Sequence, residues 1–155
     1  MRVVPYDFNS DASFKIAESS LGKIDYEANP RSFFRDPAAL KTLEKLAAGL
    51  RKDGYNIDNP RPGKACQAFC SYSPAPDRKI NIMLFVDDRT QELLECRLLT
   101  LYGQPFIYRF LRRDLLASPQ FLEHWRNFCA AIDSRLKEAL GARSVKWERD
   151  RPDQL

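Results

Sequence analysis

Two adjacent aspartates, Asp87 and Asp88, are the residues that most clearly suggest a chemical function. Paired aspartates can bind Mg²⁺ or Ca²⁺, or take part in acid–base catalysis. A metal site needs further acidic ligands, and the neighbouring sequence identifies none. Aspartate is also common in turns, because its side chain accepts hydrogen bonds from nearby backbone amides. We therefore predict a hairpin turn at Asp87-Asp88-Arg89-Thr90 and keep an acidic active site around Asp87 and Asp88 as an alternative.

The segment from residue 106 to residue 113 interleaves aromatic side chains with arginines. Aromatic rings stack on unpaired bases and arginines bind phosphates, so this composition suits RNA or single-stranded DNA. Tyrosine and arginine also dominate the hot spots between proteins. A strand with its aromatic face in the core and its arginines in solvent would explain the pattern without a ligand. The glycine–aromatic signature of RNA-recognition motifs is missing, which favours a protein over nucleic acid as the partner.

A proline-stiffened loop, Pro60-Arg61-Pro62-Gly63, offers a second polar surface. Proline reduces the entropy that a loop loses on binding, although many such loops are only connectors. The predicted partner-binding residues are Arg61, Asp87, Asp88, Phe106, Tyr108, Arg109, Arg112 and Arg113.

Catalytic chemistry has little support in this chain. His124 is the only histidine, and on a helical wheel it lies at the margin of an apolar stripe, where packing or solvation explains it. No serine or cysteine motif points to it as a base. The motifs GxSxG, Walker A, HExxH, GxGxxG and the EF-hand loop are missing. We predict a protein that is not an enzyme and that needs no metal and no cofactor.

The four cysteines are interpreted as buried, free thiols. Cys66 and Cys70 lie about 13 Å apart along one strand, which is too far for a disulfide or a shared metal within that strand. The N-terminal residues carry no export signal, and no CxxC motif is present. We therefore expect a reducing, cytoplasmic environment. The remaining cysteines are Cys96 and Cys129.

The composition is that of one ordinary folded domain. Of 155 residues, 44% are hydrophobic and 30% are charged, which excludes a disordered tail. The longest apolar run is far shorter than the roughly 20 residues of a membrane span, so we expect no membrane association. The net charge is +4, and residues 105–155 carry 10 basic against 7 acidic side chains. This excess is too diffuse for a dedicated nucleic-acid-binding domain.

Hydrophobic periodicity locates the elements that must position these residues. Asp36 is a good N-cap and Pro37 a good first residue for a helix over residues 37–53. Alternating patterns predict strands over residues 65–73, 80–86 and 93–102, and a fourth over residues 106–110. Their short connections imply an antiparallel meander. A long amphipathic helix follows from Pro119 to Leu140, and Val145 to Trp147 predict a short edge strand.

These elements predict an α+β fold: a two-layer sandwich in which a meander of three to five strands is covered by two amphipathic helices. We expect both helices on the same face of the sheet. Residues 1–35 show no lasting periodicity and are predicted to be an irregular segment docked on a single domain spanning residues 1–155.

The layout resembles the small immunity proteins of bacterial polymorphic-toxin systems, including those tied to type VI secretion. The resemblance covers the helix with Leu40, Leu43, Leu46 and Leu50 that ends at Gly54-Tyr55, the meander from Cys66 to Tyr102, and the Phe121-Trp125-Phe128 helix followed by Trp147. It implies a non-catalytic cytoplasmic protein that binds one cognate toxin and occludes its active site. It supplies no functional residues.

The layout is also similar to that of type III secretion chaperones, which bind a segment of an effector. Those proteins are usually acidic, whereas this chain has a pI near 8.9. The expected partner is therefore a toxin first and a secreted effector second, with single-stranded nucleic acid as a further alternative.

Overall fold

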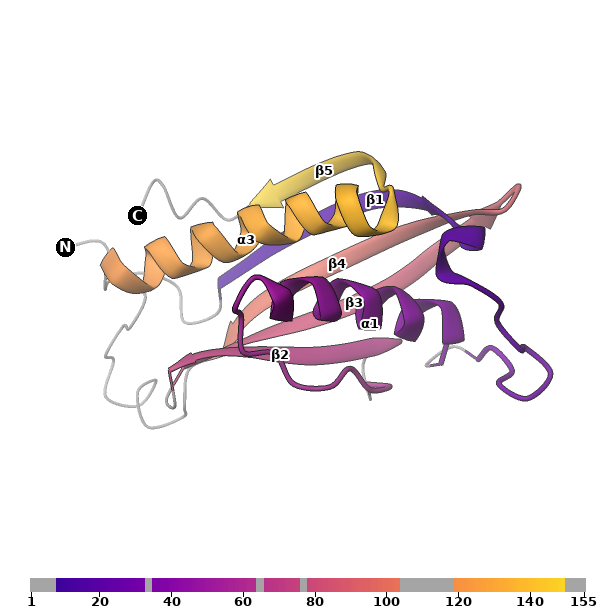
Figure 1. Ribbon diagram of the computed structural model, residues 1–155, viewed down its shortest axis with the longest axis horizontal. Helices are drawn as coiled ribbons and strands as arrows, with labels where there is room; N and C mark the ends of the chain where they lie inside the picture. Colours follow the sequence, from indigo (N-terminus) through magenta and orange to yellow (C-terminus); the bar gives the residue numbers. More distant parts are fainter. Residues whose placement is uncertain (1–7, 33–34, 64–65, 76–77, 104–118, 150–155) are drawn as a thin grey trace.

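The computed structural model describes residues 8–32, 35–63, 66–75, 78–103 and 119–149. The elements along the chain, labelled in Figure 1, are β1 (Phe8–Ala17), the short 3₁₀ helix η1 (Glu18–Leu21), α1 (Pro37–Lys52), β2 (Ala68–Ala75), β3 (Arg78–Thr90), β4 (Leu93–Gly103), α3 (Pro119–Leu140) and β5 (Arg143–Arg149). This is the predicted α+β class. The predicted strand over residues 106–110 lies outside the described residues.

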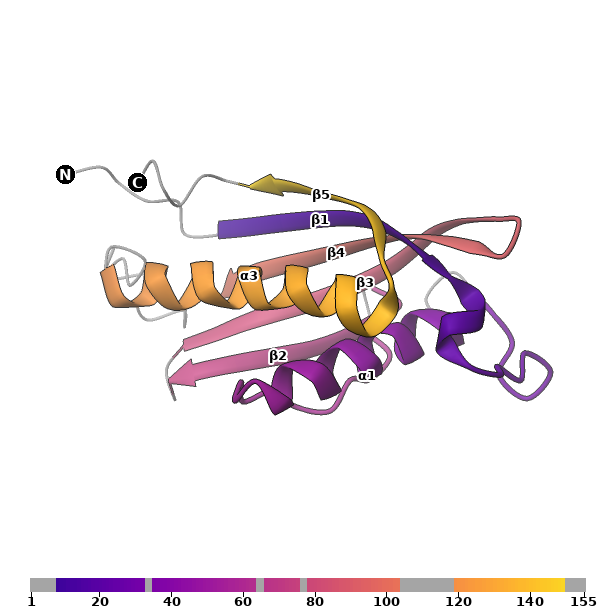
Figure 2. The ribbon, with the colours of Figure 1, turned by 45° about the horizontal axis from the view of Figure 1, so that its top comes forward.

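The strands form one antiparallel sheet in the order β2-β3-β4-β1-β5 (Figure 2). The consecutive hairpins of β2, β3 and β4 are the predicted meander. The N-terminal strand β1 then pairs with β4 on one side and with β5 on the other. Ala12, for example, lies opposite Leu98 of β4 and Trp147 of β5.

The prediction of an irregular segment over residues 1–35 is wrong for β1. Its inward positions are Ser10, Ala12, Phe14 and Ile16, all of which are buried. Two of these four residues are small, and the alternating positions between them are polar. The alternation is therefore real but weak, and pairing with two neighbouring strands supplies what local propensity does not.

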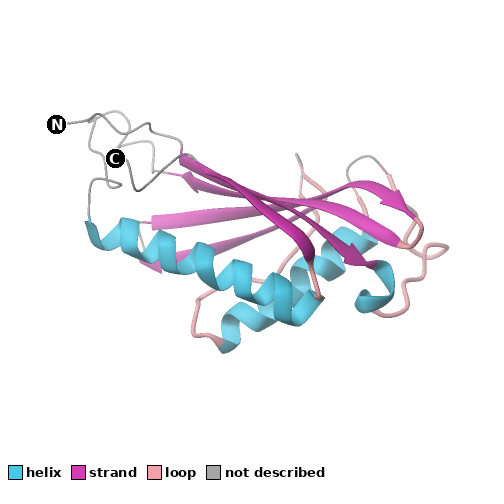
Figure 3. Cartoon of the chain, turned by 90° about the horizontal axis from the view of Figure 1, so that it is seen from above, coloured by secondary structure: helices cyan, strands magenta, loops and turns pink. Residues whose placement is uncertain are grey.

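Both long helices lie on the same face of the sheet, as predicted (Figure 3). The strand residues that face them are apolar and closely packed, since an amphipathic helix must bury its apolar stripe against another layer. Tertiary packing thus fills one side of the sheet completely. The largest fully buried side chains of this core are Trp125, Phe128, Ile16, Leu43, Leu46, Leu50, Ile80, Ile82 and Leu84.

Helix α1 begins and ends where its sequence signals predict. The Asp36 side chain accepts a hydrogen bond of 2.9 Å from the backbone N–H of Ala38, which satisfies one of the free amides of the first turn. Gly54, at a φ of +94°, follows the C-terminus in the left-handed conformation that glycine adopts without strain.

Helices α1 and α3 pack on each other through a glycine. A Cβ at Gly49 would come within 2.8 Å of Cδ of Arg135, so the glycine makes room for that side chain. The Nε of Arg135 in turn donates to a carboxylate oxygen of Asp53 at 2.8 Å. This contact fixes the end of α1 against the middle of α3. Within the described residues, no helix is long and apolar enough to cross a membrane.

Candidate functional site

Among the residues that the structure describes, no helix covers the outer face of the sheet (Figure 3). This face nevertheless carries a group of apolar side chains in β2, β3 and β4. Phe69 lies directly opposite Met83, and Met83 lies directly opposite Leu99, so three apolar side chains form a row across three strands. We call this surface the open face; its apolar residues, all partly exposed, are Phe69, Met83, Phe85, Leu99 and Leu101.

Two arginines flank the aromatic rings of the open face. The guanidinium carbon of Arg97 lies 4.8 Å from the centroid of the Phe85 ring, its cross-strand neighbour. The guanidinium carbon of Arg61 likewise lies 4.8 Å from the centroid of the Phe69 ring. Contact with a ring restricts a long side chain and leaves its charged end available to a partner.

Three of the cations on this face have a carboxylate partner. Arg97 pairs with Asp87 at 3.3 Å, and Arg61 pairs with Asp58 at 3.2 Å. Lys15 pairs with Glu95 at 3.4 Å. The open face therefore carries an apolar centre and a charged border without a large excess of either sign.

The loop that carries Arg61 is tied to the edge of the sheet. The backbone N–H of Arg61 donates to the carbonyl of Phe69 at 2.9 Å, and the N–H of Phe69 donates back at 2.8 Å. Asp58 accepts from the N–H of Ser71 at 2.6 Å. The loop thus extends the sheet beyond β2, and Arg61 has a defined position on the open face.

The predicted hairpin turn at residues 87–90 is wrong. Strand β3 continues to Thr90, and the turn is formed by Gln91 and Glu92, whose φ angles are 48° and 67°. Two successive positive φ angles are those of a type I′ turn, whose twist matches the strands that it joins. The register shifts between Val86 and Asp88, so the two aspartates lie at an irregularity inside β3.

The two aspartates have different partners. Asp87 pairs with Arg97 on the open face, whereas a carboxylate oxygen of Asp88 accepts from the backbone N–H of Arg89 at 2.7 Å. In the described part of the chain, no group of three or more histidine, cysteine, aspartate or glutamate side chains could hold a metal ion.

The structure brings together two of the predicted partner-binding residues, Arg61 and Asp87, on the open face. Asp88 follows Asp87 in the sequence, but its carboxylate accepts a hydrogen bond from the backbone N–H of Arg89. His124 is exposed on α3. The other predicted residues lie outside the described part of the chain: Phe106, Tyr108, Arg109, Arg112 and Arg113.

The apolar residues of the open face were missed because the sequence interpretation assigned only one face of each strand to the core. The signal was present in β3 and β4, which are apolar on both faces. Met83 and Phe85 alternate with Ile82 and Leu84, and Leu99 directly follows Leu98. A strand that is apolar on both faces predicts two covered surfaces, one of which can belong to a partner.

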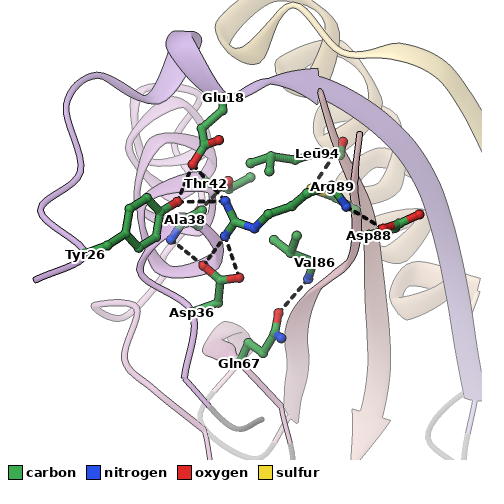
Figure 4. Close-up of polar contacts among 11 residues, drawn as sticks. Glu18, Tyr26, Asp36, Ala38, Thr42, Gln67, Val86, Asp88, Arg89 and Leu94 are labelled. Atoms are coloured by element: carbon green, nitrogen blue, oxygen red, sulfur yellow. Dashed lines mark hydrogen bonds and ion pairs between the residues drawn. The ribbon is translucent and has the colours of Figure 1, made fainter. Parts of the chain in front are cut away.

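A second cluster, centred on Arg89, joins three distant segments (Figure 4). One guanidinium nitrogen donates to both carboxylate oxygens of Asp36 at 2.7 Å. The other donates to Glu18 and to the hydroxyl of Tyr26, each at 2.8 Å. Tyr26 also donates a hydrogen bond to Glu18.

The electrostatics of this cluster match a structural role. Burial alone would lower the pKa of Arg89, but its hydrogen bonds to Asp36 and Tyr26 outweigh burial and raise it. Burial and the hydrogen bond to Glu18 raise the pKa of Tyr26. Arg89 is thus a permanent cation that links β3 to the start of α1, to η1 and to the loop after it.

The four cysteines are buried thiols outside any disulfide, as predicted. Burial raises the pKa of Cys70 and of Cys96 to about 12. Because the thiolate is the reactive form, these side chains behave as small apolar core residues at neutral pH.

No protein-family model matches this chain, and a search of curated proteins finds no match to its sequence. The geometry of the open face is therefore the basis on which a function is assigned.

Proposed function

We propose that this protein is a non-catalytic protein-binding domain, and that it is an immunity protein which neutralises a cognate bacterial toxin by covering its active site. The observation that carries the proposal is the open face: a row of partly exposed apolar side chains across three strands, bordered by ion-paired charges. Contiguous exposed apolar surface of this kind is typical of interaction sites.

The open face has the anatomy of a protein interface. Such interfaces have an apolar centre from which charged residues are depleted, and a polar rim around it. Met83 and Leu99 form the centre here, and Arg61, Arg97 and Lys15 lie at the border. Burying apolar surface contributes about 25 cal/mol per Å². The aromatic and arginine residues supply the side-chain types that dominate hot spots.

The ion pairs favour a protein over a nucleic acid as the partner. Binding to single strands needs unpaired cations that can replace the counterions of phosphates. On the open face, Arg97 and Arg61 already have carboxylate partners at 3.3 and 3.2 Å. A protein partner can accommodate such pairs at the rim, where they influence orientation and association rate.

The resemblance in layout to immunity proteins supports the more specific part of the proposal. Occlusion of a cleft requires a rigid surface rather than a reactive group. The open face meets this requirement because β3 and β4 are paired on both sides, β2 is bridged to the loop that carries Arg61, and two arginines rest on aromatic rings. A rigid surface loses little entropy on binding.

The test is affinity capture from the native host with three forms of the full chain: wild type, Leu99→Asp on the open face, and Ala130→Asp as the control. Ala130 is exposed on α3, so the control adds the same charge to the opposite layer. We expect one dominant protein with the wild type and the control, and its loss with Leu99→Asp.

The captured protein is then purified and assayed for its own enzymatic activity. We expect one equivalent of wild-type protein to inhibit it and Leu99→Asp to fail to do so. Capture that is the same for all three forms would contradict binding through the open face. Capture of a secreted effector whose activity is unaffected would contradict toxin neutralisation and support the secretion-chaperone alternative.

A further inference from the structure

A hollow of about 720 Å³ lies away from the open face, between the first half of α1 and the loop that follows η1. Its volume is in the range of sites for small organic molecules. The lining includes apolar residues from both walls and from the loop before β2, namely Ile24, Pro30, Pro37, Leu40 and Pro62.

The charges around this hollow are not balanced. Four cations line it, Lys23, Arg31, Arg35 and Lys41, against the three carboxylates of Asp25, Asp36 and Glu44. Arg89, which is not part of the lining, occupies both oxygens of Asp36. That leaves four cations against two carboxylates.

None of the four cations is ion-paired with a carboxylate among the described residues. Lys41 is engaged by a backbone carbonyl, which leaves Lys23, Arg31 and Arg35 for a ligand. On the open face, by contrast, Lys15, Arg61 and Arg97 are each paired with a carboxylate. Arg31 lies beside the ring of Tyr26, 5.7 Å from its centroid, and Tyr26 is fixed by Arg89. Lys41 donates to the carbonyl of Lys23 at 3.1 Å and so joins the two walls.

One of the two remaining carboxylates, that of Asp25, already accepts hydrogen bonds from the backbone. One oxygen of Asp25 accepts from the backbone N–H groups of Glu27 and Ala28, each at 3.1 Å. A neighbouring depression, which reaches Asp87 and Asp88, is more acidic. An anionic group is therefore favoured on the side of Lys23, Arg31 and Arg35.

From these contacts we propose that the hollow binds a small organic anion, in which a carboxylate or phosphate group is attached to an apolar body. The apolar body packs on the apolar part of the lining, formed by Ile24, Leu40 and the prolines. The anionic group pairs with Lys23, Arg31 and Arg35, which have no carboxylate partner among the described residues. This site is independent of the partner-binding role of the open face.

The proposal can be tested with the fluorescent anion 8-anilino-1-naphthalenesulfonate and the full chain. We expect the triple variant Lys23→Gln/Arg31→Gln/Arg35→Gln to weaken binding of the probe at least tenfold. A matched control, Lys79→Gln/Arg143→Gln/Lys146→Gln, removes three exposed cations elsewhere and should change the affinity less than twofold. Leu99→Asp on the open face should also leave it unchanged.

Competition identifies the anionic group. Benzoate or phenyl phosphate should displace the probe, whereas neutral benzyl alcohol should not. If benzoate displaces it more effectively, the site prefers a carboxylate; if phenyl phosphate does, the site prefers a phosphate. The proposal is overturned if the wild type does not bind the probe, if both triple variants weaken binding equally, if Leu99→Asp abolishes it, or if benzyl alcohol competes as well as the anions.

Discussion

The two faces of the sheet differ although the same strands form them. Leu98 and Leu99 are neighbours on β4, yet Leu98 is fully buried under the helices and Leu99 is partly exposed on the open face. The inner face is mostly apolar and is closed by α1 and α3. The outer face is apolar in the middle and ion-paired at its border. The same residue type therefore stabilises the fold on one side and is available to a partner on the other.

The arginines show the same contrast. Arg89 and Arg97 lie on adjacent strands, and each contacts a carboxylate. The side chain of Arg89 is 21% exposed and that of Arg97 is 44% exposed. Arg89 holds three segments together, whereas Arg97 pairs with one exposed aspartate beside a ring. Burial and the number of partners, rather than residue type, separate the structural Arg89 from Arg97, which we propose to be interfacial.

The contrast between the faces predicts the largest difference in stability. Leu98→Ala should lower the free energy of unfolding by about 3 kcal/mol, because it leaves a cavity under the helices. Leu99→Ala should lower it by less than about 1 kcal/mol, since little buried volume is lost. Urea unfolding of the two variants measures both values. Equal losses would show that the outer face is as well packed as the inner face.

The contrast between the arginines predicts the next largest difference. Arg89→Ala should lower the free energy of unfolding by about 2–3 kcal/mol, because Asp36 and Glu18 would keep their charges without a partner. Arg97→Ala should change it by no more than about 0.5 kcal/mol, as is usual for an exposed pair. Thermal and urea unfolding give the comparison, and a loss for Arg97→Ala that matches Arg89→Ala would contradict it.

The buried thiols predict a smaller, pH-dependent effect on the inner face. The ordinary cysteine pKa is 9.0, and burial raises the pKa of Cys70 and Cys96 to about 12 in the folded protein. The folded state therefore retains protons that the unfolded state releases. The stability that each buried thiol contributes to the folded state is complete below pH 9 and is lost as the pH rises from 9 to 12. At pH 10 the free energy of unfolding should be lower by about 1 kcal/mol per thiol.

Urea unfolding at pH 8 and pH 10 measures this loss. The Cys70→Ala variant should show a smaller decrease between the two pH values than the wild type. Burial also raises the pKa of Tyr55 and Tyr72, so part of the decrease will remain. If the free energy of unfolding decreases by the same amount in Cys70→Ala and in the wild type, the Cys70 thiol has the same pKa in the folded and unfolded states.

The sequence predicts the inner face of this fold much better than the outer face. Helix α3 begins and ends at the predicted Pro119 and Leu140, because a wide apolar stripe and a following glycine define it locally. Strand β1 escaped prediction because its pairing with β4 and β5 is a non-local property of the sheet. Its inward residues Ser10 and Ala12 carry almost no local signal.

The candidate site was predictable only in part. Arg61 was identified from the prolines around it, and Asp87 from its acidic neighbour. The apolar centre was not, since Met83, Phe85 and Leu99 look like ordinary strand residues. Their importance depends on which sheet face the helices cover, and that depends on tertiary packing. The partner that would cover them leaves no trace in a single chain.

The affinity of the captured partner for open-face and control variants tests the central claim most directly. Isothermal titration calorimetry should show that Leu99→Asp weakens binding at least a hundredfold, because a carboxylate would be buried at the apolar centre of the interface. Ala130→Asp, on the helix side, should bind within twofold of the wild type. If Leu99→Asp binds as tightly as the wild type, the open face is not the partner-binding surface.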